Sequence, residues 1–141
     1  MRDLDAPGIL GCYFVVQLAS SLEVGQFLKT LESFAIDVLC ILGVSACRLP
    51  DNFRDPSHKA RYMGVWVERR KIVAVGIRVT RKTTSFGINF HISPEEWILR
   101  LILPCSIAEY ELTSLALGGC RNNVREVVAT IREIAPKYFE K

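Results

Sequence analysis

The run KIVAVGIRV at residues 71–79 is the feature that most constrains the fold of this chain. Its valines and isoleucines pack well on a pleated surface, so the run predicts a strand over 71–80. A second apolar run at 62–67 precedes it across the short segment 68–70, which predicts a hairpin. The remaining strand candidates are 9–18, 44–48 and 85–92.

Two other segments carry apolar residues at the three-and-four spacing of an amphipathic helix. The first follows Ser20 or Ser21 as a cap, and we expect it to stop at Gly43. The second is capped by Asn123, with an acidic residue three positions later, and we expect Pro136 to end or kink it. This order of segments predicts an α+β fold, with a mixed, largely antiparallel sheet flanked by helices on one side.

Composition narrows the class of protein. The chain has 141 residues, is 50% apolar and 23% charged, and carries a net charge of +3, which is typical of one globular domain spanning 1–141. No apolar stretch reaches the roughly 18 residues that span a bilayer, and the first residues match no signal or transit peptide. We therefore expect no membrane partner. Aromatic residues do not alternate with the basic ones, so we expect no nucleic-acid partner either.

The five cysteines include no CxxC pair, and the two histidines add no ligand spacing, so we expect no metal site. An odd number of unpaired thiols favours a reducing compartment. One thiol stands apart: Cys105 follows Pro104 at the end of the apolar run 101–103, where strand pairing should stop. A thiol at the mouth of a core can act as a nucleophile if a nearby group takes its proton, and Lys71 is the candidate.

Taken alone, these two residues have ordinary interpretations as well. A cysteine such as Cys105 is most often a small buried apolar side chain, and a lysine at a strand end such as Lys71 is usually solvated. The hypothesis of a catalytic pair therefore depends on whether the two side chains meet.

Several separated motifs agree in order and spacing with one known family. The chain resembles the lipoyl(octanoyl) transferases in GVWV at 64–67, KIVAVGIRV at 71–79, TSFG at 84–87, PC at 104–105 and TSL at 113–115. The resemblance implies the fold of lipoate and biotin protein ligases. It also implies transfer of an octanoyl group from acyl carrier protein to a lysine of a lipoyl domain, as in 2-oxoacid dehydrogenase E2 or the glycine cleavage H protein.

In that family the cysteine of the P-C motif is the nucleophile and the lysine that opens the K-I motif shuttles protons, which implies these roles for Cys105 and Lys71. No metal, ATP or other cofactor is implied, because a thioester donor already supplies the driving force. The implied compartment is the cytoplasm, or a mitochondrial or plastid matrix in a eukaryote. Five further residues are implied to line the substrate site, namely Gly76, Phe86, Gly87, His91 and Ser106.

Three of those five depart from the family pattern. Phe86 stands where the family has histidine, His91 where it has asparagine, and Ser106 where it has glycine. A serine restricts the backbone at this point, where the N–H groups of Cys105 and Ser106 are expected to stabilise the oxyanion. His91 is either a displaced acid–base group or a partly exposed sheet residue. The sequence also begins just before the Pro7–Gly8 segment, so the family's N-terminal portion is expected to be absent. The alternative function is therefore a catalytically degenerate member, or a fragment, that binds a carrier or lipoyl domain.

Overall fold

The computed structural model describes residues 8–18, 24–48, 64–68, 70–92, 111–112, 115 and 123–139, without the side chains of 86, 111 and 112. Five strands form one sheet in the order β1–β4–β3–β2, with β5 parallel to β3 and every other pair antiparallel. The elements, in chain order, are β1 (Ile9–Tyr13), α1 (Val24–Ile41), β2 (Gly64–Val67), β3 (Arg70–Thr80), β4 (Thr83–His91), β5 (Glu111–Leu112) and α3 (Val124–Phe139). The expected mixed, largely antiparallel sheet is confirmed.

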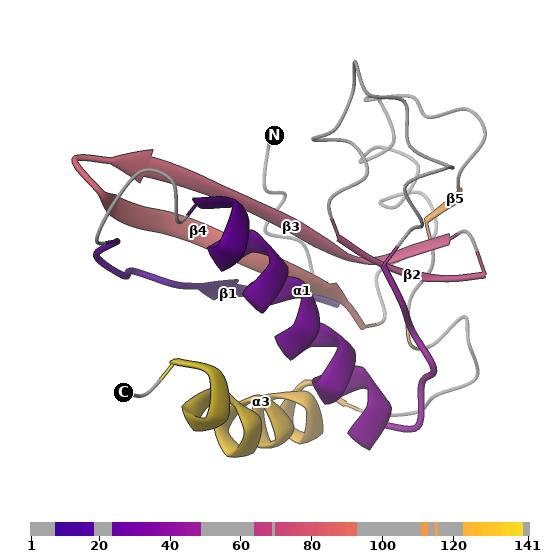
Figure 1. Ribbon diagram of the computed structural model, residues 1–141. Coiled ribbons are helices and arrows are strands. Elements are labelled where there is room, and N and C mark those ends of the chain that lie inside the picture. The colour runs from indigo at the N-terminus through magenta and orange to yellow at the C-terminus, as the bar shows by residue number, and fades with distance from the viewer. Residues whose placement is uncertain are drawn as a thin grey trace.

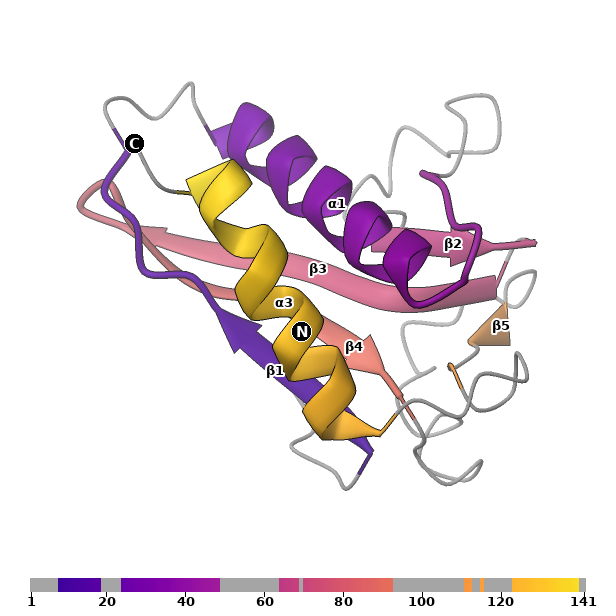
Figure 2. The same cartoon turned by 90° about the horizontal axis from the view of Figure 1, so that it is seen from below.

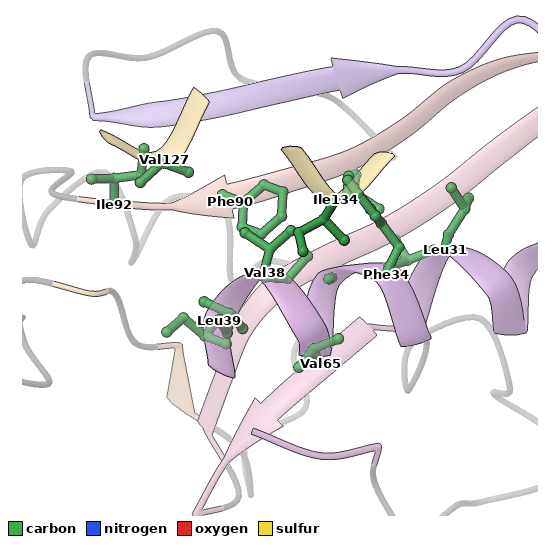
Figure 3. Packing of buried hydrophobic residues seen from close by; sticks show 14 of the residues in the cluster. Leu31, Phe34, Val38, Leu39, Val65, Phe90, Ile92, Val127 and Ile134 are labelled. Atoms are coloured by element: carbon green, nitrogen blue, oxygen red, sulfur yellow. The ribbon is translucent and has the colours of Figure 1, made fainter. Parts of the chain in front are cut away.

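Helices α1 and α3 lie side by side against one face of the sheet, which we call the helix face (Figures 1 and 2). The core fills the space between them and the strands (Figure 3). It is built from alternate residues of the strands and the apolar stripe of α1, including Leu31, Phe34, Val38, Val65, Val73, Ile88 and Phe90. Burying each such side chain stabilises the fold by about 1.5–3 kcal/mol, so this layer dominates its stability.

The end of α1 follows the sequence prediction. Gly43 adopts a positive φ of 89°, which glycine reaches without strain. Its N–H donates to the carbonyl of Cys40 at 3.0 Å, and the N–H of Val44 donates to Leu39 at 2.8 Å. These two bonds form a Schellman cap, so the predicted stop at Gly43 is confirmed. The predicted caps Ser20 and Ser21 lie outside the described residues.

The start of α3 also follows the prediction, whereas its end does not. Asn123 Oδ1 accepts the N–H of Glu126 at 2.9 Å, which confirms the cap. The helix continues past Pro136 to Phe139, so of the two outcomes expected at this proline, an end or a kink, the end is wrong. The rings of Tyr138 and Phe139 pack against Phe34 of α1, and these contacts stabilise the last turn beyond the proline.

Strand β1 ends earlier than the predicted segment 9–18. The hydroxyl of Thr84 donates to the carbonyl of Phe14 at 2.8 Å and accepts the N–H of Val16 at 2.9 Å. A side chain therefore takes the place of the backbone ladder, and the chain beyond Tyr13 keeps only an isolated bridge between Gln17 and Thr83.

The other strand predictions vary in outcome. The hairpin of β2 and β3 is confirmed, as is the strand predicted over 85–92. The expected strand at 44–48 is reduced to a single bridge between Cys47 and Trp66. Strand β5, only two residues long, is too short to have been predicted from its sequence.

Candidate functional site

A β-bulge decides which face of the sheet Lys71 occupies. Val65 pairs with Val73, but the next residue of β2, Trp66, pairs with Lys71, so β3 has one extra residue at this point. Adjacent residues of β2 point to opposite faces, and Val65 lies in the core on the helix face (Figure 3). Trp66 and its partner Lys71 therefore share the other face, which we call the far face.

The Lys71 side chain contacts two residues of β2. Its Nζ lies 5.4 Å from the centre of the Trp66 ring, within the range of a cation–π interaction. A Cβ placed on Gly64 would come within 3.0 Å of Lys71 Cε and 2.3 Å of the Val73 carbonyl oxygen. Gly64 also has a φ of 141°, so only glycine fits here, and its missing side chain leaves room for the lysine.

A row of small side chains crosses the far face beside Lys71. Gly64 pairs with Ala74, Ala74 pairs with Asn89, and Asn89 pairs with Gly11. The Asn89 side chain extends over Gly11, where a Cβ would lie 3.0 Å from Asn89 Oδ1. The strands next to the lysine therefore carry mostly short side chains, or none, on the far face.

Gly76 and Gly87, both predicted to line the substrate site, pair with each other across β3 and β4. A Cβ on Gly87 would lie 2.3 Å from the Cys12 carbonyl oxygen and 2.7 Å from the Phe14 ring. The close packing of β1 on β4 therefore accounts for glycine at position 87.

His91 is the last residue of β4 and is only 2% exposed. The expectation of a partly exposed sheet histidine is therefore wrong. Its backbone pairs with Ile9, and its carbonyl accepts the N–H of Leu115 at 3.0 Å.

The remaining predicted site residues are placed only in part. The backbone of Phe86 pairs with Ile77, next to Gly87. Cys105 and Ser106 lie outside the described residues. They belong to the segment between β4 and β5, and both of these strands pair with β3 near Lys71. Strand β4 pairs with β3 as far as Val73, and Leu112 of β5 pairs with Lys71 itself.

The described thiols differ in their environments. Burial raises the pKa of Cys12 to about 11, so its thiol stays protonated near neutral pH. Cys40 and Cys47 are exposed. Among the described residues no group of three or more His, Cys, Asp or Glu side chains could hold a metal ion. No described helix is both long enough and apolar enough to cross a membrane.

The described basic residues of β3 and of the turn that follows it lie toward opposite ends of the strand. Arg70 begins the strand, whereas Arg81 and Lys82 form the turn at its other end. Nine residue-to-residue steps along the strand separate Lys71 from Thr80, which corresponds to about 30 Å. The exposed turn is therefore remote from Lys71.

Sequence reasoning missed a buried acid, Glu32, which is 3% exposed in the middle of α1. Its Oε2 accepts the N–H of Gly64 at 3.1 Å, and its Oε1 lies 3.4 Å from Arg48 Nε. A signal was present in the sequence: Glu32 follows Leu28 by four positions and precedes Ala35 by three, so it lies within the apolar stripe of the helix.

Comparison with known proteins places the chain in a family. The family model of the lipoyl protein ligase A/B catalytic domain matches residues 4–134. The chain is 32% identical to an octanoyltransferase of Sphingopyxis alaskensis over 124 residues, which cover 84% of this chain and 52% of that protein. It spans about half the length of the curated relatives it matches.

Solved structures show the same fold at low identity. Biotin protein ligase from Aquifex aeolicus superposes with a TM-score of 0.68 at 13% identity, over 94% of this chain and 53% of that one. An archaeal lipoylation system from Thermoplasma acidophilum, comprising a bi-partite lipoate protein ligase and its E2 lipoyl domain, gives a TM-score of 0.64 at 13% identity, over 94% and 51%. The expected fold of lipoate and biotin protein ligases is confirmed.

Proposed function

Because the chain belongs to the lipoyl protein ligase A/B catalytic domain family, we propose that it transfers an octanoyl group from acyl carrier protein to a lysine of a lipoyl domain. The octanoyltransferases among its relatives support the acyl group, and the lipoate ligase solved with an E2 lipoyl domain supports the class of acceptor. The structural observation that carries the proposal is the bulge that brings Lys71 to the far face. There the lysine lies beside the row that begins with Gly64 and Ala74, which have little or no side chain.

The reaction proceeds in two acyl transfers. Lys71 takes the proton of the Cys105 thiol, and the thiolate attacks the carbonyl carbon of the donor thioester. A new carbon–sulfur bond forms to Cys105 while the bond to the carrier sulfur breaks, and the Lys71 ammonium returns the proton to the leaving carrier thiolate. The amine of the acceptor lysine then attacks the Cys105 thioester. An amide forms, Cys105 leaves as thiolate, and Lys71 passes the amine proton to it.

The topology is compatible with a meeting of Cys105 and Lys71. Cys105 precedes Glu111 by six residues, a chain that reaches at most about 20 Å. Glu111 and Leu112 pair with Arg70 and Lys71, so the segment that leads back from β5 to Cys105 begins beside the lysine. The pairing supports the proposal because the chain between Cys105 and β5 is short enough for the two side chains to meet.

The test is incubation of the 141-residue chain with octanoyl-acyl carrier protein, followed by intact mass measurement. We expect one octanoyl adduct that is absent from Cys105→Ser and retained by Cys40→Ser, the matched control that removes an exposed thiol. An unmodified wild type, or an undiminished adduct on Cys105→Ser, would contradict the mechanism.

The second half of the reaction is tested with an apo lipoyl domain. Loss of the adduct from the chain, with gain of one octanoyl group on the acceptor lysine, supports transfer. Binding of the acceptor without transfer would instead favour the alternative function, a binding module that has lost catalysis.

A further inference from the structure

We propose that Glu32 and Arg48 form a positioning pair that holds the Lys71 side chain in place through the two β2 residues it contacts. The proposal rests on the proposed function for the role of Lys71, and it adds Glu32 and Arg48 to the residues that determine the rate. Neither residue touches the far face directly, so neither is a catalytic residue.

Glu32 links α1 to the start of β2. Its carboxylate is almost wholly buried, and Oε2 accepts the N–H of Gly64 at 3.1 Å. A buried carboxylate that accepts a backbone N–H makes a strong, directional contact, which an apolar side chain of similar size would not reproduce. Glu32 therefore locates Gly64, the residue whose missing side chain makes room for Lys71 Cε.

Arg48 connects the same carboxylate to Trp66. Its Nε lies 3.4 Å from Glu32 Oε1, and its Nη2 donates to the Lys29 carbonyl at 2.8 Å and to the Ser33 hydroxyl. The adjacent residue, Cys47, exchanges two backbone hydrogen bonds with Trp66, at 2.9 and 2.8 Å. The arginine thus anchors the segment that holds Trp66 to three points on α1.

The two links converge on Lys71. Gly64 lies beside its ε-carbon, and the Trp66 ring lies 5.4 Å from its Nζ. The Glu32–Arg48 pair holds both Gly64 and Trp66 in place relative to α1. It therefore determines the space that the Lys71 side chain can occupy. A purely stabilising pair would change how much protein is folded, whereas a positioning pair also changes where Lys71 lies in the folded molecules.

The test measures Lys71 directly, by the ring-current shift that Trp66 imposes on its ε-methylene protons in NMR spectra of the folded chain, assigned by their loss in Lys71→Ala. We expect Glu32→Ala to lose this shift and to lower the kcat of octanoyl transfer about 100-fold, with the KM for the donor within about twofold. Glu32→Gln, which keeps an acceptor for Gly64, and Arg48→Lys, which keeps the charge, should fall between. Glu133→Gln, which removes an exposed carboxylate of α3, should change neither quantity.

A folded Glu32→Ala with the wild-type Lys71 shift would overturn the proposal. If Glu32→Ala does not fold, a wild-type shift in both Glu32→Gln and Arg48→Lys overturns it instead. These outcomes are independent of the proposed function, which fails if Lys71→Ala transfers octanoyl groups at the wild-type rate.

Discussion

Lys71 and Trp66 face each other across the bulged pair of β2 and β3, with the lysine Nζ 5.4 Å from the centre of the ring. If β3 alternated strictly through Ile72, with no bulge, Lys71 would lie on the same face as Val73 and Val75, beneath α1. The bulge, a single extra residue in β3, therefore places the Lys71 side chain on the far face and keeps it out of the apolar core.

The first prediction concerns the ammonium group of Lys71. Lys71→Met keeps an unbranched chain over the Trp66 ring but cannot carry a proton, so the fold should persist while the rate of octanoyl-adduct formation falls by about 10²–10⁴. Rapid-quench mass measurement gives the rate. Lys137→Met, which changes an exposed lysine of α3, should leave it unaltered.

The second prediction concerns the space at Gly64. Gly64→Ala forces a Cβ to 2.3 Å from the Val73 carbonyl oxygen at a φ of 141°, so the free energy of unfolding should fall by about 2–5 kcal/mol. Gly25→Ala is the matched control, because a Cβ there meets nothing within 4 Å. That helical site should gain up to about 1 kcal/mol, and urea denaturation of both variants measures the difference. Equal effects would contradict the geometry at Gly64.

The third prediction concerns the buried thiol of Cys12. Its pKa of about 11, against 9.0 when solvated, implies about 100-fold less thiolate at pH 8. Peptide mapping after iodoacetamide treatment should therefore show Cys12 alkylated at least about 100-fold more slowly in the native chain than in urea. Rapid native alkylation of Cys12 would be inconsistent with burial as the cause of the shift.

The same thiol makes stability depend on pH. Below pH 9 the thiol is protonated in both states, whereas between pH 9 and 11 only the unfolded state releases the proton. The free energy of unfolding should therefore fall over this interval by about 2–3 kcal/mol more in the wild type than in Cys12→Ala. Urea denaturation at pH 8, 9, 10 and 11 measures both slopes, and identical slopes would contradict the assignment.

The fourth prediction concerns the contact between α1 and α3 at Tyr138. The hydrogen bond to Asp37, with burial and the Asp37 charge, raises the pKa of the phenol to about 12, while Arg48 opposes the shift. Asp37→Asn should lower the pKa of Tyr138 toward 10, as followed by NMR titration of the ring protons. A pKa that remains near 12 in this variant would remove Asp37 as the main cause.

The fifth prediction concerns the start of α3. Asn123→Ala removes the acceptor for the Glu126 N–H, which lies 2.9 Å from Asn123 Oδ1, so the free energy of unfolding should fall by about 1 kcal/mol. Asn123→Asp retains an acceptor and should be close to the wild type in thermal denaturation. Loss of stability in both variants would indicate a different role for this residue.

Local rules predicted most of the elements but not their irregularities. The helix cap at Asn123 and the stop at Gly43 depend on residues close in sequence, so they could be read from the chain. The early end of β1 depends on the hydroxyl of Thr84, some seventy positions later, and no local pattern carries that information. The continuation of α3 past Pro136 likewise depends on contacts with α1.

The site divides in the same way. Lys71 could be singled out from its motif, but the face it occupies depends on a bulge defined by pairing with β2, which alternation along β3 cannot predict. Glu32 was missed, although it is a charged residue within an apolar stripe, because its role depends on Gly64, thirty-two positions away. The burial of His91 arises from the packing of distant segments around the end of β4, including Leu115.

The Thr84 hydroxyl has a further consequence for how copies of this chain behave at high concentration. Among the described strands, β1 lies at one border of the sheet and has only five residues, because Thr84 takes up the backbone groups of Phe14 and Val16. A short border offers few free N–H and C=O groups to a second molecule. One hydroxyl thereby shortens the template on which intermolecular β-pairing, and with it aggregation, would begin.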